Sequence, residues 1–120
     1  MTSLYTITKL TATESHFSAE ITFNPAHPVF SGHFPGKPIV PGVVLVEIST
    51  AVASRLKSCE LTLIEASVIK FLQVIEPLKH PLVIIEGSIF DEEDGRYRAD
   101  ASFYADDMIF AKLRGIRLQS

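Results

Sequence analysis

The sequence is poor in several features that define common protein classes. Its 120 residues include one cysteine, Cys59, so the chain cannot form an intrachain disulfide or a cysteine-rich metal site. No stretch reaches the roughly 18 uninterrupted apolar residues of a membrane-spanning helix. The N-terminus has no basic region followed by an apolar run, so it does not resemble a signal peptide. Together with the scarcity of cysteine, this leads us to expect a cytoplasmic protein.

Basic residues are not in excess either. Eleven Lys and Arg stand against 14 Asp and Glu, which gives a formal net charge of −3. Nucleic-acid-binding domains usually carry a basic stripe, so this balance argues against that class while leaving room for a local basic patch.

What the chain does have is enough apolar material for one core. Hydrophobic residues make up 47% of it, and no linker, repeat or low-complexity tract divides it. We therefore expect a single domain over residues 1–120.

Strand signals surround one long apolar segment. Residues 4–10 and 16–23 are rich in β-branched and aromatic residues, and "TATES" between them reads as a turn. Four further candidates are residues 61–75, 81–91, 95–105 and 108–118. The turn signals "DEEDGR" and "ADD" predict that the last three form an antiparallel meander.

The apolar segment, residues 43–57, is ambiguous because β-branched residues lower its helix propensity. Its length without a turn signal nevertheless favours a helix, apolar nearly all round and therefore buried. Pro41 and Gly42 would lie at its start, and Arg55 and Lys57 in its last turn, where cations suit the helix dipole.

One buried helix surrounded by antiparallel strands is an α+β layout. A sheet of about six strands around one helix cannot cover all of its faces and edges within this length. We therefore expect the protein to self-associate, at least as a dimer.

The segment before the helix, residues 24–42, is too rich in Pro and Gly for regular structure. Within it, Gly32 precedes His33, and Phe34-Pro35-Gly36 stiffens the backbone after it. Such rigidity suits a catalytic group, which must be held to fractions of an ångström. The alternative is that His33 only caps a tight turn.

Glu47 is the acid of the apolar segment, about 7.5 Å along a helix from Gly42. Its neighbours three and four positions away, Val43, Val44, Thr50 and Ala51, cannot neutralise it. A lone buried carboxylate often takes up a proton, and near a histidine it makes a workable acid/base pair. The alternative is that Glu47 faces water at a subunit seam.

Gly42 would open the helix, where unpaired N–H groups and the positive dipole end can polarise a carbonyl oxygen. A base, an acid and a carbonyl binder suit proton abstraction beside a carbonyl, followed by loss of a β-substituent.

The stretch "GHFPGKPIVPGVVLVE" resembles the motif G-H-F-P-G-x-P-x-x-P-G-V, followed by an acid, of the small β-hydroxyacyl-acyl carrier protein dehydratases of type II fatty acid synthesis. This FabZ-like family has the hotdog fold. "IKFLQVIEP", residues 69–77, is similar to its K-F-x-x-P-V-x-P segment.

The resemblance implies a role for each candidate. His33 would take the α-proton of a 3-hydroxyacyl thioester, the Gly42 N–H would hold the thioester oxygen, and Glu47 would protonate the departing hydroxyl. The product would be a trans-2-enoyl thioester, and no metal or organic cofactor would be needed. Val43 and Phe71 would line the acyl tunnel.

The resemblance also implies partners. Histidine and acid would meet from different protomers of a homodimer, or of a trimer of dimers. Acyl carrier protein, the acidic substrate carrier, needs a basic dock. Candidates on the last two strands are Arg96, Arg98, Lys112, Arg114 and Arg117, which could instead form a solvated sheet face.

Two departures from the family pattern point to a branch outside housekeeping fatty acid synthesis, such as an aryl polyene pathway. Ala51 stands where the family usually has a glutamine, so support for the acid is missing or comes from Ser49 or Thr50. "IEPLKHP" replaces the usual proline-glycine turn. The rival interpretations are a hotdog thioesterase and a non-catalytic acyl-binding hotdog protein.

Overall fold

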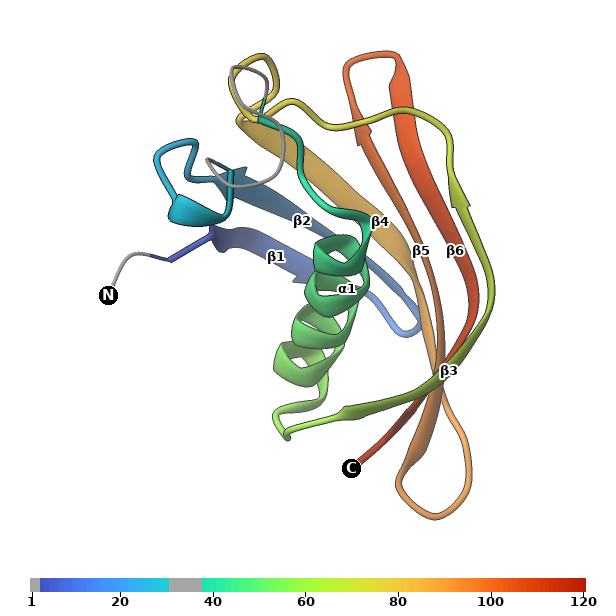
Figure 1. Ribbon diagram of the computed structural model, residues 1–120. Helices are drawn as coiled ribbons and strands as arrows, with labels where there is room; N and C mark the ends of the chain where they lie inside the picture. Colours follow the sequence, from blue (N-terminus) through green and yellow to red (C-terminus); the bar gives the residue numbers. More distant parts are fainter. Residues whose placement is uncertain (1–2, 31–37) are drawn as a thin grey trace.

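The computed structural model describes residues 3–30 and 38–120. One helix, α1 (Gly42–Lys57), packs in the hollow of a curved six-stranded antiparallel sheet (Figure 1). The strands are β1 (Tyr5–Ala12), β2 (His16–Phe23), β3 (Thr62–Phe71), β4 (Leu82–Asp91), β5 (Arg96–Ala105) and β6 (Met108–Gln119), and a 3-10 turn, η1, spans Pro28–Phe30. This is the hotdog fold, so the expected α+β layout is confirmed.

The strand order is β1-β2-β4-β5-β6-β3. The predicted meander is therefore confirmed for β4, β5 and β6, which are consecutive in both sequence and space. The structure ends β3 at Phe71, before the predicted limit at residue 75, because the chain leaves the sheet there and crosses toward the start of α1 (Figure 1).

The helix has the ends that the sequence predicts. Pro41 is its extended N-cap, and Arg55 and Lys57 lie in its last turn. Ser58 ends it in the left-handed conformation, with φ of 53°, and its N–H donates to the Arg55 carbonyl. Burial on the sheet outweighs the weak helix propensity of the valines.

One expectation about α1 is wrong: the helix is not buried all round. Its buried side chains share the face toward the sheet, and they are Val44, Leu45, Ile48, Ser49, Val52 and Ala53. On the opposite face, Val43 is 74% exposed and Glu47 is also exposed. Residues four apart share a helix face, and in this chain only one face has the sheet to pack on.

The inner face of the sheet supplies the rest of the core. Its largest fully buried side chains include Phe103, Phe110, Ile85 and Leu113. Burying one such side chain contributes about 1.5–3 kcal/mol. This layer fixes the position of α1 and hence of the residues at its N-terminus.

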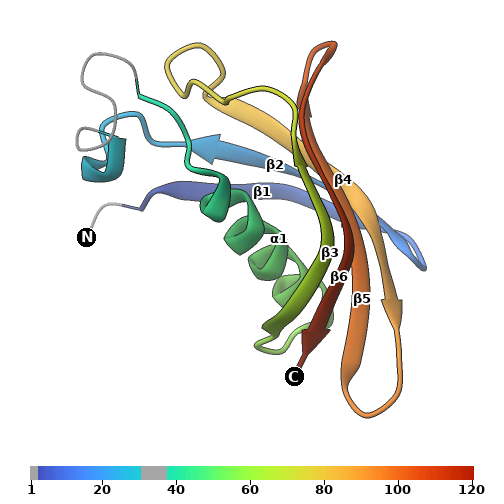
Figure 2. The same cartoon turned by 45° about the vertical axis from the view of Figure 1, so that its right-hand side comes forward.

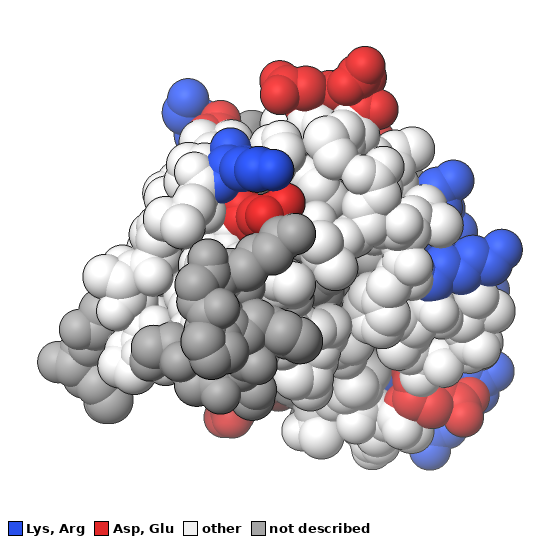
Figure 3. Space-filling view, turned by 45° about the horizontal axis from the view of Figure 1, so that its top comes forward, with Lys and Arg blue, Asp and Glu red and all other residues white. Residues whose placement is uncertain are grey.

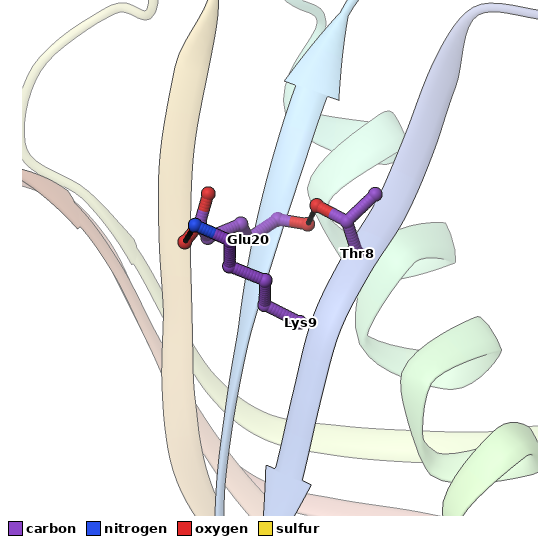
Figure 4. Close-up of polar contacts among 3 residues, drawn as sticks. All are labelled: Thr8, Lys9 and Glu20. Atoms are coloured by element: carbon purple, nitrogen blue, oxygen red, sulfur yellow. Dashed lines mark hydrogen bonds and ion pairs between the residues drawn. The ribbon is translucent and has the colours of Figure 1, made fainter.

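The two edge strands differ. β1 is attached to β2 by the ladder, by an exposed Lys9–Glu20 ion pair of 3.3 Å and by the Thr8 hydroxyl, which donates to the Glu20 carbonyl (Figure 4). At the other edge, β3 and the segment after it expose a row of large apolar side chains: Ile64, Val68, Ile69, Phe71, Leu72 and Val74. Figure 2 shows the sheet curling around α1 between these edges. Within the described ranges, no helix is long and apolar enough to span a membrane.

Candidate active site

A cavity of about 430 Å³ lies beside the start of α1. Two segments line it: residues 39–42 with Leu45, and residues 71–75 after the end of β3. The Val40 N–H donates to the Ile75 carbonyl at 2.9 Å, so the two segments are tied together. Apart from Gln73 its walls are apolar, as an acyl-binding cavity requires.

Gly42 lies where the helix meets the cavity. A Cβ at this position would come within 2.6 Å of Cζ of Phe71, so the ring of Phe71 lies directly against the helix N-terminus. The first-turn N–H groups of a helix have no acceptor within the helix, and they carry its positive dipole end. An oxygen atom bound here could accept hydrogen bonds from these N–H groups while the group that carries it contacts the Phe71 ring.

Of the three residues predicted to bind substrate, two line the cavity and one does not. Gly42 and Phe71 both line the cavity. Val43 does not line it, because its side chain projects from the opposite face of α1.

Of the predicted base and acid, the structure describes only the acid, because His33 lies outside the described residues. Glu47 lies one turn beyond Val43 on the exposed helix face, where the lone buried carboxylate expected from the sequence is not found. The exposed position agrees with the alternative that this acid faces a subunit seam.

Tyr5 of β1 lies within electrostatic range of Glu47. Its pKa is raised above the usual value, first by burial and then by the negative charge of Glu47, while Arg55 acts in the opposite direction. The carboxylate therefore lies close enough to Tyr5 for a direct electrostatic effect. Sequence reasoning missed this neighbour because the position of β1 along α1 depends on long-range packing.

The hydroxyl groups expected to support Glu47 are engaged elsewhere. Ser49 donates to the Leu45 carbonyl at 2.9 Å, and Thr50 donates to the Val46 carbonyl at 3.2 Å. Within residues 3–30 and 38–120, no hydrogen bond or ion pair reaches the Glu47 carboxylate.

The five predicted docking residues, Arg96, Arg98, Lys112, Arg114 and Arg117, lie on β5 and β6 as expected. Arg98 lies opposite Arg117, and Lys112 lies opposite Lys70 of β3, which the sequence analysis did not include. Figure 3 shows basic side chains gathered along this side of the molecule.

Several of these basic groups have local partners. Arg117 pairs with Glu65 at 3.5 Å, Arg114 donates to the carbonyls of Ala101 and Leu113, and the Arg98 guanidinium lies 5.3 Å from the ring centre of Phe90. Lys70 and Lys112 form no ion pair within the described part of the chain. Within residues 3–30 and 38–120, no cluster of three or more His, Cys, Asp or Glu could hold a metal ion.

Comparison with curated proteins finds relatives among dehydratases. Over 71 residues the chain is 31% identical to the 3-hydroxyacyl-[acyl-carrier-protein] dehydratase FabZ of Roseobacter denitrificans. The matched residues make up 59% of this chain and 45% of that protein. Over 69 residues it is 32% identical to FabZ of Dinoroseobacter shibae, covering 58% and 41%. The matches thus span less than half the length of these relatives.

Solved structures share the fold. A chain of the dehydratase heterocomplex ApeI:P from Xenorhabdus doucetiae superposes with a TM-score of 0.69 at 17% identity, over 100% of both chains. An uncharacterised protein from Erwinia carotovora subsp. atroseptica gives a TM-score of 0.59 at 19% identity, over 99% and 95%. Residues 9–106 match the sequence model of the ApeI-like family, described as ApeI dehydratase. The chain therefore belongs to the ApeI-like family of dehydratases.

Proposed function

We propose that this protein dehydrates 3-hydroxyacyl thioesters, carried by acyl carrier protein, to trans-2-enoyl thioesters. The observation that carries the proposal is the apolar cavity at the N-terminus of α1, where Gly42 and Phe71 meet. It offers N–H donors for a thioester oxygen and apolar walls for an acyl chain.

In this reaction His33 removes the α-proton while the Gly42 N–H stabilises negative charge on the thioester oxygen. Glu47 then protonates the β-hydroxyl, the C–O bond breaks, and water leaves as the double bond forms. The proton gained by His33 and the one lost by Glu47 leave the overall reaction balanced.

The assembly follows from the position of Glu47. Because the acid and Val43 lie on the exposed face of α1, away from the cavity of their own chain, a second protomer would complete each site. We place the contact at the apolar edge formed by β3 and the segment after it, in a homodimer that can assemble further into a trimer of dimers. The ApeI:P structure is a heterocomplex, so a related second chain is the other candidate partner.

We place the dock for acyl carrier protein on the outer face of β3, β5 and β6. Like charges directly opposite each other on neighbouring strands are unfavourable. Lys70–Lys112 is such a pair, and Arg98–Arg117 is a second, in which Glu65 partly offsets the charge of Arg117. An acidic partner would relieve the repulsion. The two departures from the FabZ-like pattern, at Ala51 and in residues 75–81, favour acyl substrates of a secondary pathway, such as aryl polyene synthesis, over housekeeping fatty acids.

The test offers the purified protein 3-hydroxyacyl and saturated acyl thioesters on a carrier protein. An enoyl product supports dehydration. Release of free thiol from both substrates would show a thioesterase instead, and binding without either product would show an acyl-binding protein. His33→Ala should abolish enoyl formation, and a residual rate above a tenth of wild type would refute its assignment as the base.

A further inference from the structure

We propose that Tyr5 is a positioning residue for Glu47, and that its hydroxyl donates a hydrogen bond to the carboxylate in the assembled site. This inference rests on the proposed function, because it concerns the acid of the same reaction. It is based on the polar side chains of α1 and on the position of β1 beside that helix.

The helix itself offers Glu47 little support. Positions 47, 51 and 55 share a face, and Ala51 has only a methyl group. The hydroxyl groups of α1 all donate to carbonyls of their own helix: Ser49 to Leu45, Thr50 to Val46, and Ser54 to Thr50, at 2.9, 3.2 and 2.9 Å. Arg55 is then the remaining polar side chain on this face of α1, and it lies two turns from Glu47.

β1 brings Tyr5 to this face. The Arg55 guanidinium donates to the Ile7 carbonyl at 3.2 Å, which ties the end of α1 to β1. Side chains alternate along a strand, so Tyr5 lies on the same face as the buried Ile7, and its ring packs against the core. Tyr5 is therefore held beside the helix face that carries Glu47 and Arg55.

The chemistry of the pair fits a donor and an acceptor. Burial and the charge of Glu47 both raise the pKa of Tyr5, with Arg55 opposing them, so the hydroxyl keeps its proton at neutral pH. The carboxyl group of Glu47 can accept this hydrogen bond in both of its states, because an oxygen with acceptor capacity remains when the group is protonated to act as the acid. Hydrogen bonds of catalytic groups are often long before the substrate complex forms and tighten within it.

The first experiment compares Tyr5→Phe with wild type in the dehydration assay. Misplacing a catalytic group by about 1 Å can cost a hundredfold in rate, and we expect kcat to fall about tenfold with KM unchanged. Tyr104→Phe is the matched control, because the Tyr104 hydroxyl also meets a carboxylate, Glu86 at 3.1 Å, and Tyr104 alternates with the buried core residues of β5. It should keep wild-type kcat.

A second substitution that restores activity distinguishes a role of Tyr5 in positioning Glu47 from a role in general stability. Ala51→Gln places an amide donor one turn from Glu47 on the same face, so adding it to Tyr5→Phe should restore most of the lost kcat. Unchanged kcat in Tyr5→Phe would overturn the inference. So would a lost kcat that Ala51→Gln cannot recover although both variants fold and associate as wild type.

The second experiment does not depend on the dehydration assay. The ring-carbon NMR signals of ¹³C-labelled tyrosine report the titration of Tyr5, assigned through Tyr5→Phe. Glu47→Gln removes a negative charge that favours the protonated phenol, so the Tyr5 midpoint should fall while that of Tyr104 stays. An unmoved Tyr5 midpoint would overturn the inference. Failure of the wild-type protein to dehydrate any 3-hydroxyacyl thioester would refute the proposed function instead, with this titration unaffected.

Discussion

Gly42 is the residue at which the helix, the cavity and Phe71 meet. An added methyl group would lie 2.6 Å from Cζ of Phe71 and 3.0 Å from both Cε atoms. The ring is the free end of an exposed side chain and can move, but only by changing the shape of the cavity. Gly is therefore required here by the site more than by the fold.

We predict that Gly42→Ala lowers kcat/KM for dehydration about tenfold and leaves stability nearly unchanged. Alanine in a helix is favoured over glycine by up to about 1 kcal/mol, which offsets the cost of moving the ring. Phe71→Leu combined with Gly42→Ala should recover part of the activity. Thermal unfolding and steady-state kinetics check both halves, and full activity in Gly42→Ala would contradict the close fit of Phe71 against the start of α1.

The sequence identified the acid without its surroundings. Glu47 stands out as the one carboxylate of residues 43–57, but its apolar neighbours suggested burial on every side. The sequence left its exposure as an alternative and could not decide between the two, because Val43 and Val46 look alike in a sequence whether they face the sheet or another protomer. The proximity of Tyr5, 42 positions away, depends on how β1 lies along α1.

At the scale of elements, Gly87 allows β4 and β5 to approach closely. A Cβ at this position would lie 1.9 Å from the Asp100 carbonyl oxygen, and backbone atoms of β5 cannot move aside without disturbing the ladder. Unlike the obstruction at Gly42, this one is rigid.

We predict that Gly87→Ala lowers the free energy of unfolding by roughly 2–4 kcal/mol, in the range of severe overpacking. Ser88→Ala, one residue along the same strand, is the control and should change stability by less than about 1 kcal/mol. Urea denaturation followed by circular dichroism measures both. Equal stability of the two variants would show that the sheet relaxes freely here.

Most elements could be predicted because their signals are local. Turn residues such as Asp94 and Gly95 mark the β4–β5 connection, and the long uninterrupted run 43–57 marks the helix. The strand order could not be predicted in the same way: β3 joins β6 rather than β4, its neighbour in sequence. That pairing is decided by the chain wrapping around α1, which no local pattern records.

At the scale of the whole molecule, the edge at β3 is its most incomplete surface. Native edge strands are usually protected by charge, proline or a covering element, whereas this one exposes Ile64, Val68 and Ile69 although it also carries Glu65 and Lys70. Exposed apolar patches of this kind are typical of protein–protein interfaces.

We therefore predict that the double variant Ile64→Lys/Val68→Lys dissociates the proposed dimer into chains of 13.3 kDa. Leu82→Lys/Ile109→Lys is the control, because it adds the same charge at exposed apolar positions on inner strands. Sedimentation velocity gives the masses. A stable and active wild-type monomer would contradict the assembly, and a variant that stays dimeric would place the contact elsewhere.

The last prediction joins the assembly to the chemistry. If His33 of one protomer works with Glu47 of its partner, His33→Ala and Glu47→Ala are each inactive alone. In a mixed dimer, one site has lost both groups and the other keeps both. Random pairing makes about half the dimers mixed, each with one intact site, so about a quarter of wild-type activity should return on co-expression.

The two chains carry different tags, so that mixed dimers can be purified and shown to exist before activity is measured. Purified mixed dimers should then reach about half of wild-type activity per dimer. A Glu47 that served the histidine of its own chain would leave every site with one group missing, and no activity would return. Its exposure on the face of α1 opposite the packed sheet is the structural reason to expect recovery, because that face is open to a second chain.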